Sequence, residues 1–157
     1  MKIVILVFGK TDEKYITEGI LQYQKRLKSF IPIEIEVINE PKGYGKWDVK
    51  KQKEEETRLF ESRIADVDEI VLLDEKGLEY TSESFSRKVE IWMNSGKKRL
   101  VFIIAGPYGF SNEMIIKAKH RISLSKMTFT HQMVRLIFIE QFYRAISILK
   151  GLPYHHE

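Results

Sequence analysis

The sequence predicts an α/β fold, with a mostly parallel sheet that carries helices on both faces. Short, continuous apolar runs alternate along the chain with longer stretches in which apolar residues recur every three or four positions. The longest runs, at residues 3–8 and 100–105, lack the polar alternation of a strand with one solvated face, so we expect both sides of the sheet to be covered. With 157 residues, the chain is expected to form a single domain over residues 1–157.

The predicted strands are short and rich in isoleucine and valine. They cover residues 2–8, 33–38, 69–73, 100–105 and 122–124.

The predicted helices have apolar residues at helical spacing. They cover residues 13–29, 48–65, 84–94, 112–119 and 131–149. Pro32 ends the first helix, because proline cannot continue a helical hydrogen-bond pattern. Thr81 and Ser82 are good caps for the start of the third helix, and Gly96 suits its end.

The last predicted helix is apolar around most of its circumference, more than one sheet face can bury. A second surface must cover the rest, and the simplest is the same helix of a second copy, in a two-fold homodimer. A central helix within the monomer is the alternative. The sequence does not show which of Phe138, Ile139 and Phe142 faces the partner.

Residues 39–58 combine Gly43, Tyr44, Gly45 and Trp47 with a run of lysines and a run of acidic residues. A mobile loop leading into a solvated helix explains the charges best. The two aromatic residues among lysines could instead stack on nucleic-acid bases.

Composition excludes several classes of protein. Cysteine is absent, which excludes disulfide scaffolds, thiolate nucleophiles and cysteine-containing zinc sites and suits a reducing cytoplasm. The longest apolar runs have six residues, far short of the ~20 that cross a bilayer, so no membrane is expected. The net charge of +4 arises in residues 111–157, which contain seven basic and three acidic residues; a polyanion such as RNA would suit this segment.

Common nucleotide and metal motifs are missing. Gly43 and Gly45 lack the third glycine of a dinucleotide fingerprint, and no phosphate-binding P-loop occurs. His155 and His156 are adjacent and His131 is distant, which is not a metal-ligand spacing, so no metal is expected. What remains is the carboxyl ends of the strands, where parallel sheets bind ligands. Three of these ends read LLDEKG (72–77), IAGPYG (104–109) and LSKMTF (124–129).

Together with THQMVR and the closing PYHHE, these segments resemble the SPOUT (α/β trefoil-knot) methyltransferases. Within them, the chain is similar to the small family that methylates ring nitrogen 3 of a pseudouridine in large-subunit (23S) ribosomal RNA. The resemblance covers the whole chain and is most specific from residue 123 to the end. It implies a C-terminal trefoil knot, a homodimer, S-adenosyl-L-methionine as methyl donor, and RNA of the large subunit or the assembled ribosome as substrate.

The resemblance also implies which residues bind the cofactor. One departure is that Ala105 stands where the family usually has the first of two glycines; a backbone contact survives a methyl side chain if φ is negative there. The expected cofactor-binding residues are Leu73, Ala105, Gly106, Leu124, Ser125, Lys126, Met127, Thr128 and Phe129.

The target nitrogen must lose its proton around the time it attacks the methyl group. Arg144, Tyr154 and His155 are the candidate catalytic residues, as proton acceptor or as stabilisers of the developing uracil anion. The sequence does not choose between them, and for a generic chain the terminal residues would be a frayed tail.

Two other functions fit parts of the sequence. A non-catalytic RNA-binding or ribosome-associated module would use the same basic C-terminal segment, and cofactor affinity distinguishes it from an enzyme. A flavodoxin-like nucleotide-binding domain would be unknotted, with its final helix on one face of the sheet.

Overall fold

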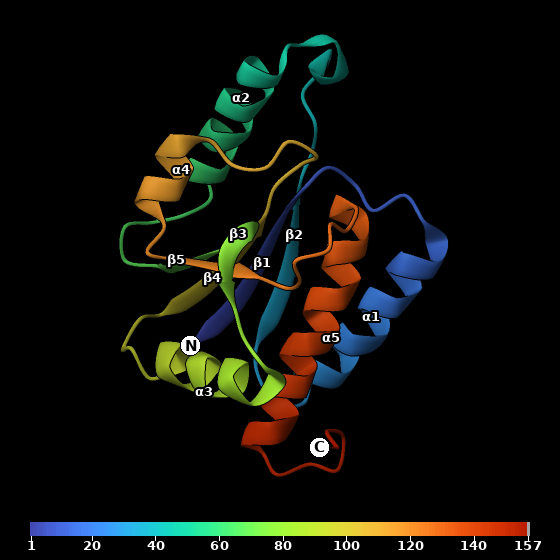
Figure 1. Cartoon of the computed structure of the whole chain (residues 1–157), viewed down its shortest axis with the longest axis vertical. Helices are drawn as coiled ribbons and strands as arrows, with labels where there is room; N and C mark the ends of the chain where they lie inside the picture. The colour runs from blue at the N-terminus through green and yellow to red at the C-terminus, as the bar shows by residue number, and fades with distance from the viewer. Residues whose placement is uncertain (157) are drawn as a thin grey trace.

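The computed structural model describes residues 1–156 and contains one five-stranded sheet between two layers of helices (Figure 1). The strands lie in the order β2-β1-β4-β3-β5, and every pairing is parallel. The predicted α/β class is confirmed. The strands are β1 (Lys2–Phe8), β2 (Ile33–Ile38), β3 (Glu69–Glu79), β4 (Arg99–Ile104) and β5 (His120–Ser123). The helices are α1 (Lys14–Lys28), the 3₁₀ turn η1 (Tyr44–Lys46), α2 (Val49–Glu61), α3 (Ser82–Met93), α4 (Asn112–Lys117) and α5 (His131–Leu149).

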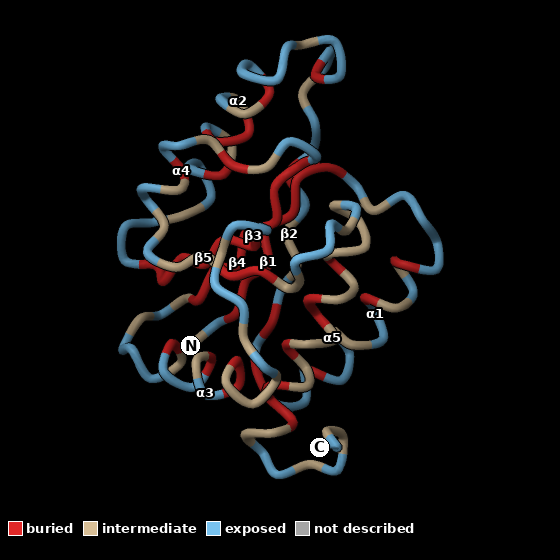
Figure 2. The backbone as a smooth tube through the Cα atoms, viewed as in Figure 1, coloured by how far each residue is buried: buried red, intermediate tan, exposed pale blue. Residues whose placement is uncertain are grey.

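Each face of the sheet carries its own apolar core. In β1, Ile3, Ile5 and Val7 pack against α1, α3 and α5, whereas Val4, Leu6 and Phe8 pack against α2 and α4. Because successive side chains of a strand point to opposite faces, a strand buried on both sides must be apolar throughout. The buried residues are accordingly concentrated in the strands and on the inner sides of the helices (Figure 2).

Helix α5 lies between α1 and α3 on the first face. Phe138, Ile139 and Phe142 are fully buried in the core of the chain itself, so none of these three faces a partner. Half-buried residues of α5 instead form a stripe at intervals of three and four positions, which places them on one side of the helix. The stripe consists of Val134, Ile137, Gln141, Arg144 and Ile148.

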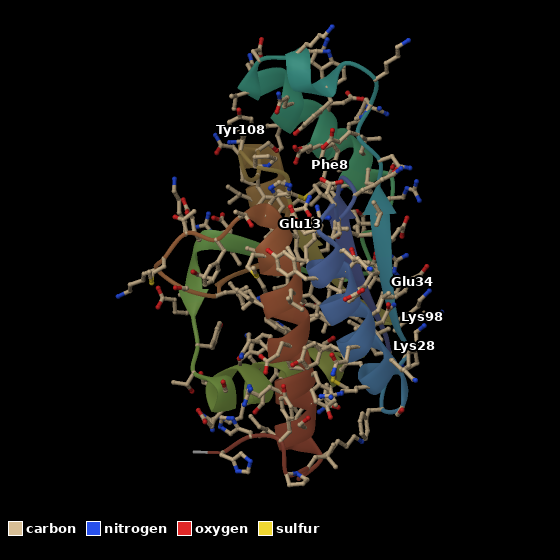
Figure 3. All side chains as sticks on the ribbon, turned by 90° about the vertical axis from the view of Figure 1, so that its right-hand side faces the viewer. Phe8, Glu13, Lys28, Glu34, Lys98 and Tyr108 are labelled. Atoms are coloured by element: carbon tan, nitrogen blue, oxygen red, sulfur yellow. The ribbon has the colours of Figure 1, made fainter. Side chains whose placement is uncertain are left out.

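Arg135 fixes the start of α5 to the end of β1. Its side chain is 3% exposed, and its guanidinium donates hydrogen bonds to the carbonyl oxygens of Phe8 and Gly9, the latter at 2.9 Å. Burial lowers the pKa of Arg135, and the charges of Asp12 and Glu40 oppose this shift. Figure 3 shows Phe8 and Tyr108 toward the end of the molecule where α2 lies, and Lys28 and Lys98 toward the opposite end.

The predicted elements are confirmed to within two residues at each end, except for two that differ by more. Strand β3 continues to Glu79, beyond the predicted end at residue 73, because β5 pairs with it on both sides of residues 74–77. Helix α2 ends at Glu61 instead of residue 65, and the chain turns at residues 62 and 63. Within residues 1–156, no helix combines the length and apolar character needed to cross a membrane.

Candidate active site

A cavity of about 300 Å³ lies between the carboxyl ends of β4 and β5 and the segment Leu73–Lys76 within β3. The loops after β4 and β5 and the first turn of α5, with His131 and Val134, complete its wall. Eight of the nine residues expected at a cofactor site line this cavity, and Lys126 does not. The eight are Leu73, Ala105, Gly106, Leu124, Ser125, Met127, Thr128 and Phe129.

The loop after β4 contributes mainly backbone to the cavity. Ala105 is 6% exposed, and among the described residues no residue other than glycine has a positive φ, so the alanine fits without strain. Gly109 has φ 74°, and its N–H donates to the Gly106 carbonyl at 3.2 Å, closing a turn that favours glycine. Alanine in place of the first glycine of the two-glycine pattern is therefore compatible with the backbone conformation of this loop.

The loop after β5 is held by its own hydroxyl groups. Ser123 donates a hydrogen bond of 2.9 Å to the Ser125 carbonyl, and the Ser125 hydroxyl accepts one of 2.9 Å from the N–H of Met127. Thr130 then caps α5, because its hydroxyl accepts a hydrogen bond from the N–H of Met133. The turn and the cap together fix the path of the chain between the cavity and the helix.

Charged residues stand at one side of the cavity, most of them within β3. Asp74 and Glu75 line it, together with Lys53 and Lys76. Arg121 lies 3.4 Å from an Asp74 carboxylate oxygen and pairs with it. The pocket thus combines an apolar floor, open backbone groups and a charged rim, which is the usual composition of a small-molecule site.

The candidate catalytic residues gather at the other end of α5. Tyr154 donates a hydrogen bond of 2.9 Å to Glu140 Oε1, and Arg144 donates to the same oxygen at 2.5 Å. Arg144 also lies 3.3 Å from His155 Nδ1. The chain end is therefore packed against the helix and is not a frayed tail over residues 151–156.

These contacts determine which group can move a proton. Burial, with the hydrogen bonds to Tyr23 and Glu140, raises the pKa of Tyr154 far above its ordinary value. Burial lowers the pKa of Arg144, but the hydrogen bond and charge of Glu140 outweigh it and the net shift is upward. Both residues therefore remain protonated donors at neutral pH, and His155 is the one candidate of the three whose side chain has a basic nitrogen that can accept a proton.

The hydrogen bonds of His155 assign its tautomer. Nε2 lies 2.6 Å from Glu83 Oε1, so it carries the proton and donates to the carboxylate. Nδ1 then faces the Arg144 guanidinium as an acceptor.

Within one chain, the cavity is distant from the cluster of candidate catalytic residues, Arg144, Tyr154 and His155. His131 borders the cavity and Arg144 belongs to the cluster, and thirteen residues of helix separate them. At 1.5 Å per residue this is roughly 20 Å along the helix axis. A group bound in the cavity is therefore out of reach of Arg144, Tyr154 and His155 of the same chain.

Sequence reasoning missed three residues around the cavity because they lie in the charged segment 39–58. Lys53 lines the cavity, Tyr44 is 5% exposed and Glu56 is 3% exposed. Neither a mobile loop nor a base-stacking role fits Tyr44, whose ring packs on Phe8 with centroids 4.9 Å apart. The spacing of Gln52, Glu56 and Phe60 by four residues was the available signal, because it marks one buried helix face.

Among residues 1–156, no three histidine or acidic side chains gather in a way that could hold a metal ion.

Comparison with known proteins identifies a family. Residues 1–155 match the family model described as "Predicted SPOUT methyltransferase". The chain is 52% identical to "Ribosomal RNA large subunit methyltransferase H" of Parabacteroides distasonis, over all of both chains. It is 49% identical to the protein of that name in Christiangramia forsetii, over 99% of each chain. Among solved structures, an A. aeolicus TrmH/SpoU tRNA modifying enzyme aligns over 99% of this chain and 82% of its own, with 13% identity and a TM-score of 0.42.

Proposed function

Because the chain belongs to the SPOUT methyltransferase family, we propose that it methylates ring nitrogen 3 of a pseudouridine in large-subunit ribosomal RNA, with S-adenosyl-L-methionine as donor. The relatives named above are called ribosomal RNA large subunit methyltransferases, and they align with this chain from end to end. The observation that carries the proposal is the cavity between β3, β4 and β5, lined by eight residues expected at a cofactor site. The whole chain acts as one such domain, in the cytoplasm where ribosomes are made.

The cavity fits the proposed cofactor in size and in chemistry. Its volume of about 300 Å³ lies at the lower end of the range for small-molecule sites. Leu73, Ile104 and Phe129 offer an apolar slot for a purine ring, and the backbone around Ala105 and Ser125 offers hydrogen bonds to its polar edge. When bound, the cofactor supplies an electrophilic methyl group on a sulfonium, which the protein has only to hold in line with the attacking nitrogen.

We further propose that the site is completed by a second copy of the chain. A two-fold pairing of α5 through its half-buried stripe, with the two-fold axis perpendicular to the helix, sets the two helices side by side in opposite directions. The Arg144 end of one helix then lies beside the His131 end of the other, which removes the separation of roughly 20 Å. Each active site would thus combine the cavity of one protomer with Arg144, Tyr154 and His155 of its partner.

In this arrangement the residues divide the work. Arg144 and Tyr154 donate hydrogen bonds to the uracil oxygens, where negative charge develops as the nitrogen loses its proton. His155 accepts that proton at Nδ1 once Arg144 has turned to the base, and Glu83 stabilises the imidazolium through Nε2. Lysines around the site contact phosphates and make RNA binding salt-dependent.

Two measurements test the proposal. Calorimetric titration should show binding of S-adenosylmethionine, and radiolabelled methyl transfer should occur to ribosomes that lack this modification, with mass mapping locating the product. Removal of residues 154–157 should abolish transfer and leave cofactor binding intact, because the cavity contains none of these residues. RNA binding without cofactor binding would instead identify a non-catalytic module, and full activity of the truncated protein would remove the C-terminal residues from the mechanism.

A further inference from the structure

Glu56 is a buried carboxylate outside the site described above. It is the last of three consecutive glutamates, and its side chain is 3% exposed while Glu54 is solvated. Burial of a carboxylate is costly unless its oxygens accept hydrogen bonds. A buried glutamate therefore needs hydrogen-bond donors. These donors show which segments of the chain the carboxylate connects.

The two oxygens of Glu56 have one partner each. Oε1 accepts a short hydrogen bond from the hydroxyl of Tyr44, in the 3₁₀ turn before α2. Oε2 accepts a hydrogen bond of 3.0 Å from the backbone N–H of Gly106, fifty residues later in the loop after β4. The carboxylate thus connects α2, the 3₁₀ turn and the wall of the cavity.

A side chain at Gly106 would fit only if the Glu56 carboxylate moved. A Cβ atom at Gly106 would lie 2.6 Å from Glu56 Oε1 and 3.2 Å from the Tyr44 hydroxyl. Gly106 is glycine because the carboxylate occupies the space of a side chain, since its φ is not positive. A Gly106→Val variant would therefore collide with Glu56, and it does not isolate contact with a ligand.

The same contact orients the peptide next to the cavity. The N–H of Gly106 donates to Glu56, which does not line the cavity, so this donor is not free to bind a ligand. Ala105 and Pro107 on either side both line the cavity. The direction of this one N–H thus fixes which groups of the loop face the cofactor site.

We propose that Glu56 and Tyr44 are positioning residues that hold the Gly106 peptide in its cofactor-binding orientation. This inference rests on the proposed function, because the cavity is taken to bind S-adenosylmethionine. Neither residue lines the cavity, so each acts only through the loop. Loss of the acceptor leaves a buried N–H unpaired, and the peptide can then rotate toward the cavity to regain a partner.

Three variants separate positioning from folding. Glu56→Leu keeps the volume and removes the acceptor; because this leaves the Tyr44 hydroxyl and the Gly106 N–H unpaired, circular dichroism first establishes that the variant is folded. Glu56→Gln keeps an oxygen for the Gly106 N–H. Gln52→Ala is the matched control, because Gln52 is also buried in α2 and holds the Trp47 carbonyl at 2.9 Å, with no contact to Gly106.

Calorimetric titration with S-adenosylmethionine gives the first readout. Glu56→Leu should raise the dissociation constant about tenfold, the effect of one unpaired buried donor. Glu56→Gln and Gln52→Ala should stay within about threefold of the wild type, and Tyr44→Phe should fall between these values. A folded Glu56→Leu protein with unchanged affinity would overturn the inference, as would an equal loss in Gln52→Ala.

Hydrogen exchange at the Gly106 amide gives a second readout that needs no cofactor. The amide should be protected in the wild type and in Glu56→Gln, and about tenfold less protected in Glu56→Leu. If the wild type binds no cofactor, the proposed function fails while this measurement still decides the orientation of the peptide. Unchanged protection in Glu56→Leu would refute the role of Glu56.

Discussion

His155 Nε2 lies 2.6 Å from Glu83 Oε1, so the end of the chain is joined to the first turn of α3. The pKa of Glu83 is lowered to about 2, first by its own backbone N–H, then by the Thr81 hydroxyl and by His155. A carboxylate with a lowered pKa stabilises the fold above its unfolded pKa of about 4.3, and this contribution disappears as the pH falls toward 2.

Glu83→Gln should therefore lower the melting temperature most above pH ~4.3, and the difference from the wild type should vanish toward pH 2. Thermal unfolding of both proteins between pH 2 and 7 measures it. Glu90→Gln is the control, since Glu90 is exposed on the same helix. A difference that stays constant with pH would mean that the charge of Glu83 is not what holds the tail.

Glu140 organises the candidate catalytic residues through a single oxygen, which accepts from Arg144 and Tyr154. Glu140→Gln removes the charge that pairs with Arg144. We expect kcat for methyl transfer to fall at least about tenfold with an unchanged dissociation constant for S-adenosylmethionine, because only the transition state uses these donors. Single-turnover assays and calorimetry measure the two quantities. A loss of cofactor affinity as large as the loss of kcat would contradict the proposal that the cavity binds the cofactor while Glu140, Arg144 and Tyr154 act only on the substrate base.

The half-buried stripe of α5 is the surface proposed to pair with a second copy. Ile137 lies near its centre, so Ile137→Glu should place an unpaired charge in the interface and weaken the dimer by at least about a hundredfold. Ile116→Glu is the control, because Ile116 is 83% exposed on α4. Sedimentation at micromolar concentrations distinguishes dimer from monomer. A wild-type protein that sediments as a monomer would end the proposal of a shared site.

Gly77 lies where β3 passes closest to β5. A Cβ atom there would be 2.6 Å from backbone atoms of Arg121 and Ile122, which cannot move as a flexible side chain does. Gly77→Ala should cost about 1–3 kcal/mol in urea denaturation. Gly45→Ala, with no atom within 4 Å of the added Cβ, should change stability far less. Equal stability of the two variants would show that β3 and β5 can move apart at Gly77 without a cost in stability.

Burial raises the pKa of Glu56, and the hydrogen bonds from Tyr44 and Gly106 oppose this shift only in part. Glu40 raises it further and Lys53 lowers it. Since the folded pKa is above the unfolded one, ionisation destabilises the fold as the pH rises beyond about 4.3. Glu56→Gln should therefore gain stability relative to the wild type with rising pH. Urea denaturation at pH 4, 6 and 8 tests this, and a gain that shrinks would reverse the sign.

The sequence predicted the strands and helices well because β1 and β4 contain continuous apolar runs and β2 alternates isoleucine with glutamate. Residues 2–8, 33–38 and 131–149 match the observed elements. The end of β3 was not predictable in the same way, since Asp74 and Gly77 have the composition of a loop. The strand continues past them because β5, more than forty residues later, supplies hydrogen-bond partners at Leu78 and Glu79.

The cavity residues were predictable from strand ends and family resemblance, whereas their supports were not. A polar helix residue is normally solvated, and no local pattern distinguishes Glu56 from Glu54 or Glu55 except its spacing from Phe60. Whether Glu56 is buried or solvated depends on its hydrogen bond with Gly106, which lies fifty residues away in the sequence. Only the tertiary structure reveals that the carboxylate of Glu56 fills the space where a side chain at position 106 would lie.

The position of α5 at the end of the chain has a consequence for biosynthesis. One face of the sheet is closed only when Phe138, Phe142 and Ile146 arrive, after every strand has been made. A nascent chain that has formed the sheet therefore exposes a broad apolar surface until the last helix emerges, the kind of surface that chaperones bind. Translation that stops before α5 leaves this apolar surface exposed. We expect incomplete chains to be recognised and removed through this surface, which is buried in the full chain.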